Sequence, residues 1–238
     1  MHENNQNSNS FIDKLVQELR PVQPVSLAKY LFGMAILLVT VAAYFLAAVG
    51  FRPDIWMKFS ELSYLLSLAV LSGATLLSAW VCLSSAIPSR LTDLQMRKWI
   101  WGLPVFFMTA TIFYAQLYGA NATVLMHFSF WEALGCCLRI AKGTLLPSAL
   151  LLFVVGYLAP LNPWWTMSFG VFTGAMLTSL VSQLNCPIND PLHIFIGHGL
   201  LVILFAGLLH FVFMLPFTLL LRVLARYRSP GGLQKREN

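Results

Sequence analysis

The chain has 238 residues, of which 58% are apolar and 10% are charged, and its formal net charge is +6. Soluble domains carry about 25% charged residues, so this chain has too little charge to cover a water-exposed surface. The composition excludes a soluble globular enzyme, a secreted disulfide-rich protein and a disordered chain. The 15 Lys and Arg are scattered between apolar blocks, which indicates membrane topology rather than nucleic-acid binding.

The first 30 residues are mostly polar and contain one amphipathic pattern. Apolar side chains recur from Phe11 through Leu15 to Leu19 at the spacing of one helical face, and Pro21 ends the pattern. The predicted helix of about ten residues is too short to span a membrane or to be stable alone in water. It lies on the membrane surface or docks on another protein, and the periodicity leaves both interpretations open.

Six apolar blocks are long enough for a membrane-spanning helix, which needs about 20 residues. They run over about Leu31–Val49, Leu62–Leu83, Ile100–Tyr118, Ile140–Ala159, Trp164–Leu184 and Ile194–Leu221. The sequence therefore predicts an all-α integral membrane protein with six transmembrane helices. Its predicted parts are an N-terminal segment (1–30), a transmembrane domain (31–222) and a basic tail (223–238).

The positive charges predict the orientation of these helices. Eleven of the 15 Lys and Arg fall in the N-terminal segment, the tail and the connections on their side, and four fall on the opposite side. Because basic residues are retained in the cytoplasm, both termini are predicted to be cytoplasmic.

The four cysteines fall at the ends of predicted spans. Cys82 lies near the reducing cytoplasmic side, whereas Cys136, Cys137 and Cys186 lie at the outer ends of the fourth and fifth spans, which the short turn Pro160–Pro163 joins. A bond from Cys186 to Cys136 or Cys137 is sterically feasible. A structural disulfide, a redox or metal sensor, and unpaired thiols all remain open.

Asp190, His193 and His198 follow Cys186 in the sequence and are also metal-ligand types. Their spacing matches no recognised metal motif, and two histidines five residues apart fit one α-helical face poorly. We therefore expect local hydrogen bonds here, with no metal site and no cofactor. For His210, in the middle of the last span, we expect a helix-packing hydrogen bond, and a proton relay is the less favoured role.

Other sequence motifs of catalysis are missing. The chain has no Gly-rich phosphate loop, no His-Glu-x-x-His, no Gly-x-Ser-x-Gly and no Cys-x-x-Cys. Carboxylates are nearly absent from the predicted spans, which disfavours a transporter or pump. The sequence thus predicts no catalytic residue and favours a small sensor, a regulator or a structural subunit over an enzyme.

Four stretches covering most of the chain are similar to those of one family. They are Phe11–Leu15 with Leu19–Val22, Phe51–Ile55 with Pro88–Arg90, Cys137–Ile140 leading to Pro147, and Gly170 and Gly174-Ala175 leading to Cys186–Pro191. In these stretches the chain resembles the NrsF-type membrane-bound anti-sigma factors. The first and last stretches are the most specific.

The resemblance implies a six-span protein that holds an extracytoplasmic-function sigma factor at the bacterial inner membrane and does not contact nucleic acid itself. The sigma-binding residues it implies are Phe11, Leu15, Leu19, Arg20 and Pro21, assisted by the Ile87–Lys98 connection. The alternative function is a thiol-active membrane enzyme or a structural subunit of a membrane complex.

The resemblance also implies two outward-facing cysteines that set the signalling state of the protein. Cys137, which precedes Leu-Arg-Ile, matches the first, and Cys186 matches the second. Cys136 doubles the first cysteine, so the thiol that partners Cys186 stays open. A redox or metal stress signal at these thiols would then release the sigma factor.

Overall fold

A computed structural model of the chain describes residues 26–87, 90–119, 129–158, 160, 162–188 and 190–228. The predicted N-terminal helix, with Phe11, Leu15, Leu19, Arg20 and Pro21, lies outside the described residues. So do Pro88 and Ser89 of the second connection.

The described residues form helices joined by short connections, and none of them belongs to a strand, which confirms the all-α prediction. The helices are α2 (Leu27–Val49), α3 (Ile55–Lys58), α4 (Leu62–Ala86), α5 (Asp93–Gly119), α6 (Phe130–Gly156), α7 (Pro163–Asn185), α8 (Pro191–His193), the π-helix η1 (Ile194–Leu200) and α9 (Leu201–Arg228).

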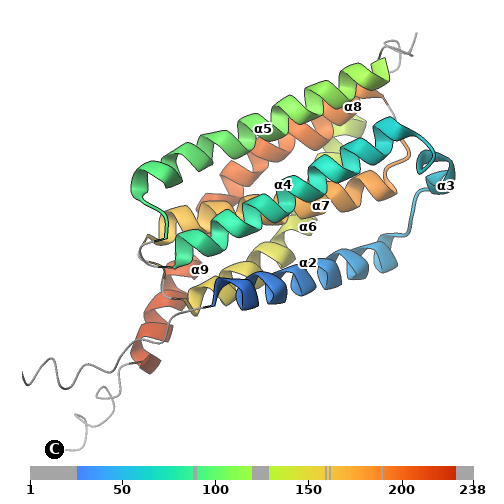
Figure 1. The fold of residues 1–238 in the computed structure, drawn as a ribbon. Helices are drawn as coiled ribbons and strands as arrows, with labels where there is room; N and C mark the ends of the chain where they lie inside the picture. Colours follow the sequence, from blue (N-terminus) through green and yellow to red (C-terminus); the bar gives the residue numbers. More distant parts are fainter. Residues whose placement is uncertain are drawn as a thin grey trace, which may run out of the picture.

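Five described helices are long and apolar enough to cross a membrane: α2, α4, α6, α7 and the continuous helix from Ile194 to Leu224. Among the described residues this criterion finds five spans, one fewer than the six that the sequence predicts. The helix left out is α5, which begins with Asp93 and carries Arg97 and Lys98 in its first two turns. Charged side chains are costly in lipid, so they lower the apolar character of this helix. It nevertheless runs along the bundle beside α4 (Figure 1).

The bundle has two ends that matter for the site (Figure 1). Helices α3 and α8 lie at one end, which we call the α3 end. Helix α2 begins and α9 finishes at the opposite end. A change at the α3 end must therefore pass along the helices to reach the start of α2.

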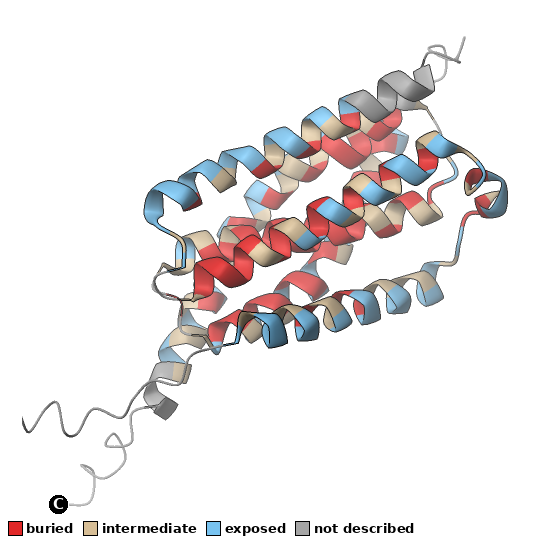
Figure 2. Ribbon diagram, viewed as in Figure 1, coloured by how far each residue is buried: buried red, intermediate tan, exposed pale blue. Residues whose placement is uncertain are grey.

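Helix α7 lies at the centre and packs against α4 and α6 (Figures 1 and 2). Small residues allow this close approach: a Cβ added at Gly174 would lie 3.1 Å from the backbone nitrogen of Ser148 on α6. On the other side, the hydroxyls of Ser78 and Thr173 are 2.7 Å apart across the α4–α7 interface. Small residues and interhelical hydroxyl bonds are the usual basis of helix association in lipid, where apolar burial provides little drive.

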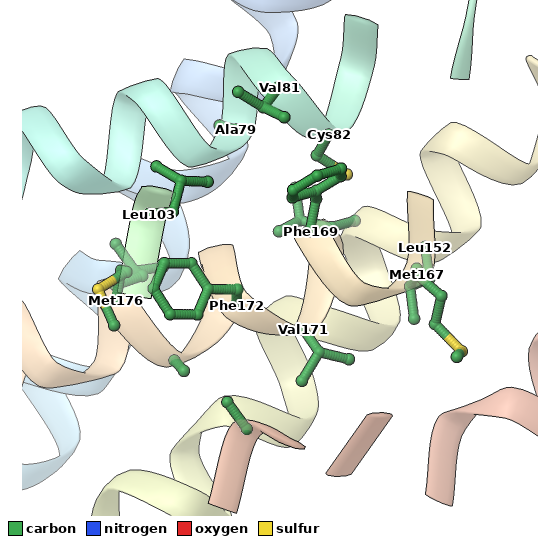
Figure 3. Packing of buried hydrophobic residues seen from close by; sticks show 14 of the residues in the cluster. Ala79, Val81, Cys82, Leu103, Leu152, Met167, Phe169, Val171, Phe172 and Met176 are labelled. Atoms are coloured by element: carbon green, nitrogen blue, oxygen red, sulfur yellow. The ribbon is translucent and has the colours of Figure 1, made fainter. Parts of the chain in front are cut away.

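The apolar core surrounds α7 (Figure 3). Phe169, Phe172 and Met176 of α7 lie among Leu103 of α5 and Leu152 of α6, and all five are buried. These contacts fix α7 within the bundle, because each large buried side chain resists displacement in a densely packed interior.

Helix α2 is much less embedded than α7 (Figure 2). Its buried residues are Met34, Leu38 and Val41, spaced along a single face, and large apolar side chains such as Phe32 and Val39 are exposed. In a membrane those exposed side chains would face lipid. A narrow contact stripe of this kind permits α2 to shift with fewer contacts broken than a shift of α7 would require.

Candidate functional site

Four buried side chains with metal-ligand atoms meet near the α3 end of the bundle. They are Cys136 of α6, Cys186 directly after α7, His193 of α8 and His198 of η1, and their ligand atoms all lie within 4.8 Å of one another. We call this set the Cys–His cluster. Residues from three separate segments of the chain therefore form one compact site.

The contacts inside the Cys–His cluster join each thiol to an imidazole. Cys136 Sγ lies 3.2 Å from His198 Nε2, and Cys186 Sγ lies 3.7 Å from His193 Nε2. The two Sγ atoms are 3.8 Å apart. The Ser182 hydroxyl lies 3.6 Å from Cys136 Sγ and is a further polar neighbour. All four cysteines of the chain are free thiols in this structure.

The π-helix η1 explains why two histidines five residues apart share one site. In an α-helix that spacing would separate the side chains by about 140° around the axis. The wider π-helical turn has hydrogen bonds between residues five apart, as in the bond from the Leu201 N–H to the Ile196 carbonyl. The poor fit of this spacing to one α-helical face therefore does not keep the two imidazoles apart. A π-helical segment is frequent at functional sites and has no simple sequence signature.

Glycines bring η1 close to its neighbours. A Cβ on Gly197 would lie 3.0 Å from the carbonyl oxygen of Ala133 on α6, and a Cβ on Gly199 would lie 3.2 Å from the Thr111 hydroxyl oxygen on α5. Ala133 is one helical turn before Cys136, so the contact at Gly197 sets the distance between the cysteine and His198. Larger side chains at these glycines would push η1 away from the thiols.

The structure brings together some of the predicted site residues and separates others. Cys136, rather than the adjacent Cys137, faces Cys186; Cys137 is buried but is not part of the Cys–His cluster. Cys82 is buried beside the Thr166 carbonyl, outside the cluster. Asp190 also lies outside it and accepts a bond of 2.8 Å from the Leu192 N–H.

His210 makes the helix-packing contact expected for it. Its Nδ1 lies 3.0 Å from the Ser168 hydroxyl of α7, and its ring lies at 4.1 Å from the Trp164 ring, centre to centre. This bond joins α9 to α7 and confirms the predicted role.

A cavity of about 490 Å³ reaches the thiols between α2, α6 and α7. Cys136 and Cys186 line it, together with Val49 at the end of α2 and the basic residues Arg139 and Lys142. Although the thiols are buried in the sense of small exposed area, they therefore adjoin an open space that a small reagent can enter.

Comparison with known proteins identifies the family. The family model for NrsF, the negative regulator of sigma F, matches residues 15–218. The chain belongs to the NrsF family. No curated protein and no solved structure matched the chain. The family name makes the protein a negative regulator whose partner is a sigma factor, and the apolar helices make it a multi-pass membrane protein. The resemblance found in the sequence is thus confirmed.

In this NrsF-family chain, Arg52 connects the Cys–His cluster to α2. Arg52 follows α2, is 3% exposed, and donates from Nε to Asp54 at 2.6 Å and from Nη2 to the Pro187 carbonyl at 3.3 Å. Its backbone N–H bonds the Leu184 carbonyl at 3.0 Å. Pro187 directly follows Cys186, so the buried Arg52 side chain links the turn at Cys186 and Pro187 with the end of α2. The hydrogen bond from Arg52 holds the pKa of Asp54 below its ordinary value.

A second bond strengthens the same connection. The Asn185 side-chain amide at the end of α7 donates to the Gly50 carbonyl at 2.8 Å. Gly50 has φ 84°, a backbone conformation that glycine adopts readily and other residues rarely do. This turn directs the chain from α2 across the end of α7. We call Arg52, Asn185 and their partners the α2–α7 clamp.

Proposed function

We propose that the protein is an anti-sigma factor of the bacterial inner membrane that holds an extracytoplasmic-function sigma factor by its N-terminal segment. It releases the sigma factor when a redox or metal stress signal acts on the outer thiols. The observation that carries this proposal is the Cys–His cluster at the α3 end, opposite the end where the N-terminal segment enters α2. A sensor and its effector segment would then lie on opposite sides of the membrane.

The positions of the helix ends support a topology with both termini in the cytoplasm. Helix α2 begins and α9 finishes at the same end of the bundle, and basic residues such as Lys29 and Arg222 lie near that end. An excess of Lys and Arg favours the cytoplasmic side. The cluster then faces the oxidising outer side, where thiol chemistry is available as a signal.

The N-terminal segment is proposed to bind the sigma factor through Phe11, Leu15, Leu19, Arg20 and Pro21. The support is the amphipathic pattern of the sequence, the cytoplasmic side proposed for this segment, and the sigma factor in the name of the family. An apolar helical face is a common means of docking into a groove of a partner protein.

The thiols offer a chemically simple trigger. A peroxide can oxidise Cys136 and Cys186 to a disulfide: the two thiol hydrogens leave with the two peroxide oxygens as water, and one S–S bond forms. That bond is about 2.05 Å long, whereas the two Sγ atoms are 3.8 Å apart. Its formation would bring the two sulfur atoms about 1.8 Å closer and so pull α6 and the end of α7 toward each other.

The α2–α7 clamp provides a path from this movement to the N-terminal segment. Displacement of Cys186 moves the Pro187 carbonyl, which Arg52 binds, and Asn185, which binds Gly50. Because α2 has only a narrow buried stripe, it can follow the clamp while the middle of α7, away from its Cys186 end, stays fixed by core contacts. The proposed switch is a two-state shift of α2 that the outer site biases.

Co-purification tests the proposed function directly. The tagged full chain, solubilised in detergent from its native membranes, should retain a sigma factor that mass spectrometry identifies. Leu15→Asp should abolish retention, because burying an unpaired charge in a docking face is strongly unfavourable. Gln17→Asp, which adds the same charge on the polar face of the predicted helix, is the matched control and should retain the partner. A wild-type preparation without any sigma factor would overturn the proposal.

A further inference from the structure

The distances in the Cys–His cluster match the edges of a metal coordination tetrahedron. With Zn–S at about 2.3 Å and Zn–N at about 2.0–2.1 Å, tetrahedral ligands place two sulfurs about 3.8 Å apart and a sulfur and a nitrogen about 3.5 Å apart. The observed Sγ–Sγ distance is 3.8 Å, and the two Sγ–Nε2 contacts are 3.2 and 3.7 Å. These three of the six ligand–ligand distances are close to tetrahedral edges, and all four ligand atoms lie within 4.8 Å of one another, so small side-chain shifts would place them around a single cation.

The two imidazoles have few other polar partners. The Nδ1 atoms of His193 and His198 are buried and have no hydrogen-bond partner within the described part of the chain. Their Nε2 atoms face only sulfur, which is a weak donor and a weak acceptor. Buried polar groups usually have a strong partner, because leaving one unsatisfied costs about 1–3 kcal/mol. Coordination of a cation by both Nε2 atoms would give these two nitrogens a strong partner in place of sulfur, with the imidazole proton held on Nδ1.

Charge balance also favours a divalent cation. Metal binding converts two thiols to thiolates and releases their protons to water, so two thiolates, two neutral imidazoles and one divalent cation have a net charge of zero. A neutral complex can be buried at far lower cost than an isolated ion. No carboxylate belongs to the cluster among the described residues, and thiolate and imidazole ligands select Zn²⁺-like cations over Mg²⁺ or Ca²⁺.

We propose that Cys136, Cys186, His193 and His198 form a four-ligand tetrahedral site for a divalent d¹⁰ cation of the Zn²⁺ class. All four coordination positions are filled by side chains, as in structural rather than catalytic zinc sites. The cavity beside Cys136 and Cys186 gives the cation a route to the ligands. Binding would hold η1 against α6 and the end of α7.

The inference that this site controls sigma-factor release rests on the proposed function, whereas the inference that it binds a metal does not. Both the cation and a disulfide require Cys136 and Cys186, so the two modifications exclude each other. Oxidation would expel the cation, and a bound cation would protect the thiols from oxidation. The two states place the sulfurs at different separations, and the α2–α7 clamp connects that difference to α2.

Metal binding can be measured on the purified, reduced full chain in detergent. After dialysis against micromolar Zn²⁺, elemental analysis should find one equivalent of metal per chain. Co²⁺ in its place should give the visible bands of a tetrahedral complex and thiolate-to-metal charge transfer in the ultraviolet. Cys136→Ser and His198→Gln should each weaken Zn²⁺ binding by at least about tenfold. Cys82→Ser and His210→Gln, a thiol and an imidazole outside the cluster, are the matched controls and should bind like wild type.

Alkylation of the wild-type protein gives a test that needs no variant to fold. Zn²⁺ should slow the modification of Cys136 and Cys186, as followed by mass spectrometry, and leave the rate at Cys82 unchanged. Lack of Zn²⁺ binding by the reduced wild type, or equal alkylation rates with and without Zn²⁺, would overturn the metal site. Sigma-factor retention is scored in the same preparation: metal binding without a sigma factor refutes the proposed function alone, and the reverse result refutes the site alone.

Discussion

Replacing Arg52 with Met should separate sensing from repression. Met keeps an apolar stem but removes the guanidinium that joins Asp54 to the Pro187 carbonyl. A hydrogen bond to a charged group contributes about 1.5–3 kcal/mol. Asp54, the Pro187 carbonyl and the Tyr64 ring, whose centre lies 5.9 Å from the guanidinium carbon, all lose this partner, and Asp54 is 33% exposed, so solvent compensates part of its loss. We therefore expect the free energy of unfolding to fall by about 2–4 kcal/mol.

The functional expectation for Arg52→Met is more specific than the loss of stability. The sigma factor should still co-purify with the reduced protein, because the variant leaves the N-terminal segment unchanged. Oxidation at the Cys–His cluster should release much less of it than from wild type, since the link from Pro187 to α2 is broken. The measurement is the fraction of sigma factor retained before and after peroxide treatment, together with thermal unfolding in detergent.

Arg97→Met is the matched control for this experiment. It removes an Arg–Asp pair of similar chemistry, Arg97 with Asp93 at 3.1 Å, in which both side chains are more than half exposed. Such a pair contributes about 0.2–1 kcal/mol, so the stability of this variant should stay close to wild type. If Arg52→Met unfolds like Arg97→Met, or releases the sigma factor as fully as wild type after oxidation, the proposed coupling through the clamp is refuted.

Three further predictions concern the thiols, the helix interface and pH. Cys136→Ser should abolish the oxidant-induced disulfide with Cys186 in a gel-shift assay, and Cys137→Ser should retain it. The reverse pattern would contradict the geometry of the Cys–His cluster. Gly174→Ala should lower the free energy of unfolding by about 1–3 kcal/mol, because the added Cβ would press against the backbone of α6. Gly73→Ala is the control and should be neutral or slightly stabilising, because no atom lies within 4 Å of its added Cβ. Equal thermal stabilities of the two variants would refute the close packing at Gly174. Because the pKa of Asp54 is lowered, its ion pair stabilises the fold above the ordinary carboxyl value of 3.8 and loses that effect as pH falls through the folded pKa. The difference in the free energy of unfolding between wild type and Asp54→Asn should therefore shrink in acid. A difference that stays constant with pH would refute this explanation.

The sequence by itself determined the class of protein and the family. Long apolar blocks with little charge can be stable only in a membrane, and this follows from composition without any tertiary contact. The apolar blocks predicted most helix ends closely, but α6 begins at Phe130 rather than Ile140, α5 begins at Asp93 rather than Ile100, and α9 ends at Arg228 rather than Leu221. The sequence did not distinguish α5 from the other five predicted spans, because its apolar block begins only at Ile100. The helix itself begins at Asp93 and so also includes the charged turns before that block.

Tertiary structure alone decided which thiol belongs to the site. Cys136 and Cys137 are neighbours on α6, and consecutive residues of an α-helix point about 100° apart, so the rotation of α6 selects the one that faces Cys186. That rotation is set by packing against α7 and η1, including the approach of Gly197 to Ala133. No local pattern in the sequence contains this information.

The same reason applies to the histidines and to Arg52. The spacing of His193 and His198 favours separation in an α-helix, and only the π-helical turn aligns them. In the sequence, Arg52 is only one of the positive charges between predicted spans that indicate topology. In the structure it contacts the Pro187 carbonyl, 135 positions away, and is almost completely buried. The apolar pattern of a chain specifies which segments leave water, whereas a site built from three segments depends on how their helices turn and meet, which is fixed only when the bundle packs.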